Sequence, residues 1–107
     1  MVNDSVLVET IHFRLADGVT DEAFLEASDA LQSSVFDRID GFLSREITKE
    51  DGARQWTIIV RFRNEQACNE AGSEMMTSES GLELLKMIDP SSMEMTRSKL
   101  MKAYIRE

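Results

Sequence analysis

Few side chains in this sequence are suited to acid–base chemistry, and the clearest is the single histidine, His12. Imidazole takes up and releases protons near neutral pH, so His12 is the natural candidate for a catalytic acid or base. It lies in a run rich in β-branched and aromatic residues, where a strand would place it on one face with Val8 and Thr10. There it could face a cavity, or it could be a hydrogen-bonded histidine at a subunit interface.

A second group of residues could bind an aromatic ligand. Trp56 and Phe62 would share one face of a strand, and Met75 could fill the irregular gaps beside a flat ring. Tyr104 could donate a hydrogen bond to the same ligand. An ordinary hydrophobic core is the commoner role for such aromatic and methionine side chains, and Tyr104 could simply anchor the last strand.

Two arginines on neighbouring predicted strands could hold an anionic group. Arg45 and Arg61 could bind the carboxylate or enolate of a substrate. The alternative is pairing with carboxylates such as Glu9 or Glu46, because sheet surfaces often carry cross-strand charge pairs.

The composition predicts one acidic domain spanning 1–107. The formal net charge of -8 would repel phosphates, so we expect no nucleic-acid partner. One cysteine and one histidine do not suffice for a structural zinc site, and we expect no metal. The sequence has neither a membrane-length apolar run nor a secretory signal, which predicts a cytoplasmic protein without a membrane partner. Phosphate-loop, Gly-x-Ser-x-Gly and His-Glu-x-x-His motifs are absent.

The apolar pattern predicts four strands, at 6–15, 42–48, 54–63 and 92–104. A helix capped by Thr20 follows the first strand; its apolar stripe recurs at three- and four-residue steps and comprises Phe24, Ala27, Leu31, Val35 and Ile39. Gly41 would cap the end of this helix, because glycine adopts positive φ without a Cβ clash.

The second helical region is predicted in two pieces. Asn64 would cap the first, and Ser80 with Glu83 would form a capping box for the second. The side chains expected to point inward are Ala67, Cys68, Ala71, Met75, Leu82, Leu85 and Ile88. Pro90 ends the region, since the residue before a proline avoids helical geometry.

The order of these elements, β-α-β-β-α-β, predicts an α+β fold of ferredoxin-like type, with a four-stranded antiparallel sheet. Two helical regions can cover only one face of such a sheet. The strands nevertheless carry apolar residues on both faces. A second copy of the chain would bury the open face, so we expect a homodimer packed sheet to sheet.

Several segments carry a resemblance to a known family: 13–15, 17–19, 24–27, 41–45 and 56–62, of which Gly41-Phe42-Leu43 is the most telling. With the order of elements, they resemble the antibiotic-biosynthesis-monooxygenase-like group of dimeric α+β barrel proteins, over nearly the whole chain. The resemblance implies a homodimeric barrel. It also implies a small-molecule enzyme, a monooxygenase that works without a cofactor on an aromatic or polyketide-like compound.

The resemblance leaves a second function open, a non-catalytic ligand-binding or structural homodimer. Haem-degrading members use a histidine on the second helical region, and this chain has none there. Haem degradation is therefore not expected. The sites implied on the monooxygenase reading are His12 for catalysis and Trp56, Phe62, Arg45, Met75 and Tyr104 for substrate binding.

Overall fold

The computed structural model describes residues 5–106, so the outermost residues of the predicted domain, 1–4 and 107, lie outside it. Its elements, in chain order, are β1 (Leu7–Phe13), α1 (Asp21–Ser34), η1 (Phe36–Arg38), β2 (Phe42–Lys49), β3 (Trp56–Phe62), α2 (Glu65–Thr77), α3 (Glu79–Lys86), η2 (Pro90–Ser92) and β4 (Glu94–Lys99).

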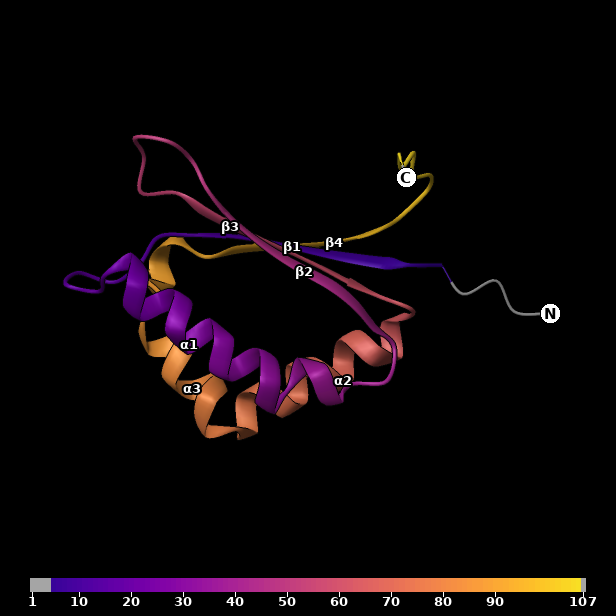
Figure 1. Ribbon diagram of the computed structural model, residues 1–107, viewed down its shortest axis with the longest axis horizontal. Helices are drawn as coiled ribbons and strands as arrows, with labels where there is room; N and C mark the ends of the chain where they lie inside the picture. The colour runs from indigo at the N-terminus through magenta and orange to yellow at the C-terminus, as the bar shows by residue number, and fades with distance from the viewer. Residues whose placement is uncertain (1–4, 107) are drawn as a thin grey trace.

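The four strands form one antiparallel sheet in the order β2-β3-β1-β4. Among residues 5–106, every helix lies against the same face of the sheet, and no helix covers the opposite face (Figure 1). This arrangement confirms the predicted ferredoxin-like α+β fold, with β1 and β3 as the inner strands. We call the uncovered surface the open face.

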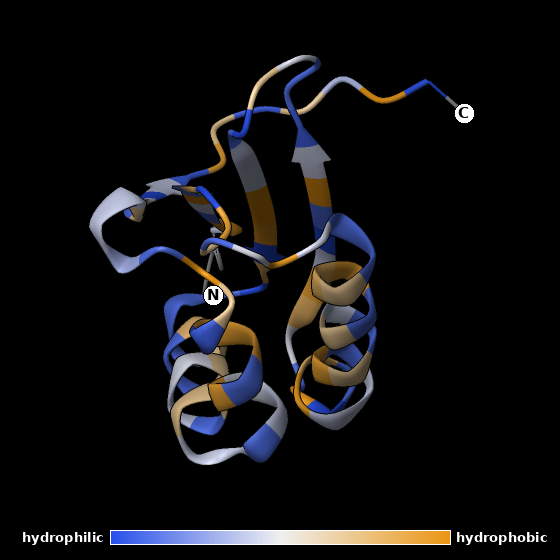
Figure 2. Ribbon diagram, turned by 90° about the vertical axis from the view of Figure 1, so that its left-hand side faces the viewer, coloured by the Kyte–Doolittle hydropathy of each residue, from blue (hydrophilic) through white to orange (hydrophobic). Residues whose placement is uncertain are grey.

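The core lies between the sheet and the helices, and β3 shows why. Its side chains alternate between buried and half-buried along the strand, and the buried set is Trp56, Ile58, Val60 and Phe62. Phe13 and Phe24 pack on Trp56, with ring centroids 6.3 Å and 5.2 Å from the indole. Figure 2 shows the helices as two columns beneath the sheet, with α1 packed against α3.

Helix α1 begins where the sequence predicts. The Thr20 hydroxyl accepts a hydrogen bond from the Ala23 N–H, and two acidic residues occupy the first turn. The helix ends at Ser34, however, and a short 3₁₀ turn follows. Gly41 is therefore not the helix cap that was predicted. Its φ of 99° instead turns the chain from η1 into β2.

The pairing of β2 with β3 contains a β-bulge. Phe42 lies opposite Phe62, whereas Ser44 lies opposite Arg61, so Leu43 is an extra residue on β2. After the bulge, Arg45 lies opposite the buried residue Val60. Arg45 is thereby placed on the helix-covered side of the sheet.

The start of α3 differs from the prediction. Ser78, not Ser80, caps it, because the Ser78 hydroxyl accepts a hydrogen bond from the Gly81 N–H. The side chains that point inward also differ from the prediction. Leu84 is 1% exposed, whereas Leu82, predicted to be buried, is 43% exposed.

Leu85, also predicted to point inward, is only half-buried, whereas Ile88 is buried as expected. In α2 the predicted cap is correct, since the Asn64 side chain accepts a hydrogen bond from the Ala67 N–H. Ala67, Cys68 and Ala71 are buried.

The strands β1, β3 and β4 are shorter than predicted, because pairing stops where the neighbouring strand ends. The largest difference is in β4, which was predicted to run to Tyr104 and ends at Lys99. The residues that follow leave the sheet on the side away from the helices (Figure 1). Within the described residues, no helix has the length and apolar character needed to cross a bilayer.

Candidate functional site

A small cavity lies between the sheet and the helices. It has a volume of about 40 Å³ and is lined from every layer of the domain, by residues of β1, β2 and β3 and of α1, η1, α2 and α3. Most of the lining is apolar, and includes Leu31, Val60, Met75 and Leu84. The two charged residues on its wall, Arg45 and Glu9, are the groups through which it could recognise a polar ligand.

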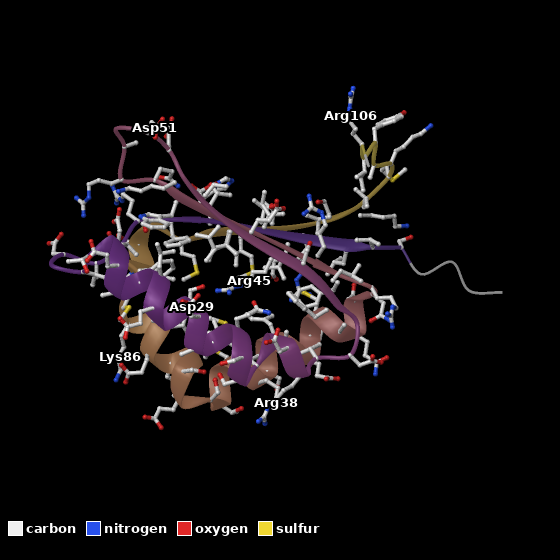
Figure 3. The ribbon with its side chains drawn as sticks, in the orientation of Figure 1. Asp29, Arg38, Arg45, Asp51, Lys86 and Arg106 are labelled. Atoms are coloured by element: carbon white, nitrogen blue, oxygen red, sulfur yellow. The ribbon has the colours of Figure 1, made fainter. Side chains whose placement is uncertain are left out.

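Arg45 enters the cavity from β2. Its Nη1 donates a hydrogen bond to the side-chain oxygen of Gln32, 3.2 Å away on α1. The guanidinium carbon lies 4.8 Å from the centroid of the Phe36 ring, in a cation–π contact. Figure 3 shows Arg45 in the space between the sheet and α1, on the side of the sheet where Asp29 lies.

The charge of Arg45 is only partly compensated. Burial lowers the pKa of Arg45 to about 10, and the negative charge of Asp29 offsets part of this shift. The guanidinium stays protonated at neutral pH. Among residues 5–106, no carboxylate forms an ion pair with it. A half-buried cation in this setting is a suitable partner for an anionic or enolate oxygen.

Glu9 reaches the cavity from β1. Its side chain is 14% exposed and its Oε2 accepts two hydrogen bonds, from Arg97 Nε at 3.2 Å and from the Cys68 thiol at 3.6 Å. Arg97 is itself held by the side-chain oxygen of Asn69, 2.9 Å from its Nη1. Within the described part of the chain, the other carboxylate oxygen, Oε1, accepts no hydrogen bond.

Cys68 is a buried thiol, as predicted. Burial raises its pKa to about 11, and the negative charge of Glu9, which accepts the S–H hydrogen bond, adds to the shift. The group is therefore a neutral donor near pH 7 and a poor nucleophile.

The structure places His12 on the open face, on the opposite side of the sheet from the cavity. Its Nδ1 lies 2.9 Å from the Thr57 hydroxyl, across the β1–β3 pairing. Glu94 of β4 lies opposite it on the other side. His12 therefore cannot act on a ligand held between Arg45 and Glu9 in the same protomer.

The other predicted site residues separate into two groups. Arg45 and Met75 meet at the cavity, whereas Trp56 and Phe62 are buried core residues outside its lining. Tyr104 lies beyond the last strand and is 84% exposed.

Arg61 takes the pairing role that was the alternative to anion binding. It lies on the open face, and its Nη1 is 2.7 Å from Glu46 Oε1.

Sequence reasoning missed Glu9 as a site residue, although a signal was present. In the alternating pattern of β1, Glu9 occupies the series Leu7, Glu9, Ile11 and Phe13, the side that faces the helices. A charged residue with little exposed surface in an otherwise apolar series is informative, because such residues are rarely buried unless paired. Among residues 5–106, no cluster of three or more histidine, cysteine, aspartate or glutamate side chains is arranged to hold a metal ion.

Comparison with known proteins identifies similar folds but does not assign the chain to a family. No family model matches the sequence, and no curated protein matches it. The structure is similar to that of a mutant form of SnoaB, a cofactor-independent oxygenase from Streptomyces nogalater, with a TM-score of 0.77 at 12% identity, covering 92% of this chain and 96% of that one.

Two further solved structures share the fold. A dimeric ferredoxin-like protein from an uncultured marine organism has a TM-score of 0.73 at 13% identity, over 96% of this chain and 94% of that one. A candidate antibiotic biosynthesis monooxygenase from Chloroflexus aurantiacus has a TM-score of 0.69 at 12% identity, over 94% and 97%. At these identities the likeness establishes the fold alone, so a function has to be argued from the cavity.

Proposed function

We propose that this protein is a small-molecule enzyme, a monooxygenase that needs no metal or organic cofactor and acts on an aromatic or polyketide-like compound. The observation that carries the proposal is Arg45, a half-buried guanidinium on an apolar cavity, without an ion-pair partner among the described residues. Such a site would stabilise the oxyanion formed when a phenol or an activated ketone loses a proton. A substrate in that form can itself supply electrons to dioxygen.

Substrate entry requires the cavity to expand. A volume of about 40 Å³ holds a few water molecules, whereas pockets for drug-sized ligands measure roughly 300–1,000 Å³. Met75 is the lining residue best suited to this change, because its unbranched side chain has three rotatable bonds and is half-buried. We propose that Met75 moves aside and then contacts the ring of the ligand.

We also propose a homodimer formed through the open face. That face carries half-buried apolar and hydroxyl side chains, including Val8, Thr10 and Ile59, on the two inner strands. A dimeric protein of the same fold, at 13% identity, supports this assembly. His12 would then lie in the interface between the two copies. Its predicted catalytic role would therefore require a site formed by both copies together. A cytoplasmic location agrees with the one free cysteine.

Oxygen uptake tests the enzymatic proposal. A panel of hydroquinones and anthrones would be supplied to the purified protein, with and without a chelator, and dissolved oxygen followed by electrode. We expect uptake above the buffer rate that is insensitive to the chelator and falls at least tenfold in Arg45→Met. Uptake equal to buffer for the whole panel would reject the oxygenase function. The predicted role of His12 is tested with His12→Ala, and oxygen uptake that is unchanged in this variant would contradict that role.

The small volume of the cavity favours a second function, a non-catalytic homodimer. Its core is closely packed, with Phe13, Phe24 and Phe62 at or below 1% exposure. In that case the panel would give no oxygen uptake, and the compounds would not shift the melting temperature. Light scattering at micromolar concentration would still give the mass of a dimer.

A further inference from the structure

The two oxygens of the Glu9 carboxylate have different surroundings. Oε2 is held by Arg97 and by the thiol of Cys68, while Oε1 has no hydrogen-bond partner among residues 5–106. The side chain lines the same cavity as Arg45. One oxygen thus fixes the orientation of the carboxylate, and the other is free to meet a ligand.

We propose that Glu9 is the catalytic base of this cavity and takes a proton from the ligand with Oε1. The inference rests on the proposed function in requiring a ligand with an acidic C–H bond next to a carbonyl group. In the step, that C–H bond breaks and its proton forms an O–H bond with Oε1. The electron pair moves onto the carbonyl oxygen as an enolate, and dioxygen is the oxidant that later consumes it.

The surroundings of Glu9 suit this role. Arg97 and Cys68 restrict the rotation of the carboxylate, and a base that is held in place loses little entropy when it reacts. Glu9 and Arg45 both lie opposite Val60, one on each neighbouring strand. A ligand that spans Val60 could therefore present its C–H bond to Glu9 and its oxygen to Arg45.

The other ionisable groups nearby are less suitable as the base. Cys68 is protonated near neutral pH, since its pKa is raised to about 11. His12 lies on the opposite side of the sheet. Asp29, which acts on Arg45 through its charge, is exposed on α1 and does not line the cavity.

Deuterium exchange without oxygen isolates the proton-transfer step. Anthrone would be incubated anaerobically with the full-length protein in D₂O buffer, and the loss of its methylene proton signal followed by NMR. We expect the protein to accelerate exchange above buffer and Glu9→Gln to lower that acceleration by about 100-fold or more, as is typical for loss of a general base. Glu46→Gln is the matched control, because Glu46 is paired with Arg61 on the open face of the same sheet.

A folding defect in Glu9→Gln is distinguished by rescue. Glu9→Ala leaves space for a small carboxylate, so added formate should restore exchange in that variant if Glu9 is the base. Exchange in Glu9→Gln equal to wild type, or a fully folded Glu9→Ala that formate does not rescue, would overturn the proposal.

The same measurements separate this inference from the oxygenase function. Oxygen uptake that is unchanged in Glu9→Gln would overturn the role of Glu9 and leave the oxygenase intact. Exchange by the wild type that is lost in Glu9→Gln, without oxygen uptake, would support Glu9 and reject the oxygenase. A wild type that accelerates neither process would overturn both.

Discussion

Glu9 and Arg45 lie opposite the same residue, Val60, from the two strands that flank β3. Neighbouring strands are about 4.8 Å apart, so the backbones of the two residues are separated by roughly 10 Å, with Val60 between them. A negative and a positive side chain thus stand at the two sides of one apolar cavity. Neither forms an ion pair with the other.

The first prediction is that Arg45 opposes folding stability while serving ligand binding. Arg45→Met should leave the free energy of unfolding unchanged or raise it by about 1 kcal/mol, because it removes a desolvated charge and keeps the apolar bulk. Urea unfolding measures this change. Arg61→Met is the control, because it removes an arginine of the same sheet that is paired with Glu46 on the open face. A loss of more than about 2 kcal/mol in Arg45→Met would contradict the prediction.

The second prediction concerns the turn into β2. Gly41→Ala should lower the free energy of unfolding by roughly 2–4 kcal/mol, because the residue has a φ of 99° and the new Cβ would lie 2.8 Å from the Ala67 Cβ. Gly52→Ala, at a φ of 71° with open space around it, should cost only about 1 kcal/mol. Equal losses in the two variants would show that the contact with α2 is unimportant.

The third prediction tests the start of α3. A Cβ on Gly81 would collide with the backbone oxygen of Met75, so Gly81→Ala should lower the free energy of unfolding by more than about 3 kcal/mol. Gly72 lies inside α2 with open space around it, and Gly72→Ala should raise that free energy by about 0.5–1 kcal/mol. Thermal unfolding of both variants is followed by circular dichroism. Stability should fall in Gly81→Ala and rise in Gly72→Ala.

The fourth prediction is a loss of stability at alkaline pH that depends on Cys68. Its pKa in the folded protein is about 11, above the ordinary thiol value of 9.0. Folding is then favoured by the protonated thiol below pH 9, and this contribution disappears as the pH rises through 11. Wild type should lose on the order of 1–2 kcal/mol more than Cys68→Ala between pH 9 and 11. Arg45 also has a pKa in this range, but it is present in both proteins, so its contribution cancels in the comparison. Parallel curves of unfolding free energy against pH would therefore mean that Cys68 does not titrate as described.

The fifth prediction concerns the open face. Ile59→Asp should produce a folded monomer, since Ile59 is half-buried on that face and lies outside the core. Sedimentation equilibrium at micromolar concentration measures the mass, and circular dichroism confirms folding. Leu82→Asp, on the exposed side of α3, should remain dimeric. A dimer that persists in Ile59→Asp would place the interface elsewhere.

Most of the fold was predictable because strands and helices impose strict side-chain periods. The alternation from Trp56 to Phe62 correctly identified the residues that share one face of β3. The start of α3 was not predictable in the same way, because Ser78 and Ser80 are both capable of capping a helix, and the close approach of Gly81 to the Met75 backbone accompanies the cap at Ser78. Local pattern alone does not contain that contact.

The site was predicted in part. Arg45 and Met75 were predicted from their residue types to bind a ligand, and the structure brings them to one cavity, while their role stays a prediction. The position of His12 relative to that cavity could not be derived, since the sequence shows which residues share a face but not which face the helices cover. Glu9 was not predicted as a site residue, because a single acid on a strand is equally compatible with a cross-strand charge pair.

The bulge at Leu43 has a consequence for how β2 can change. Side chains along a strand alternate, and the one extra residue shifts this alternation between Phe42 and Arg45. Arg45 and Ile47 have the same parity, and Ile47 packs against the core. Deleting Leu43 would restore regular alternation, with Ser44 still opposite Arg61 and Arg45 still opposite Val60, so Arg45 and Ile47 would keep pointing toward the helices. A descendant of this protein can therefore lose the extra residue without moving the buried charge, whereas one residue inserted between Ser44 and Arg45 would turn Arg45 outward and also remove Ile47 from the core.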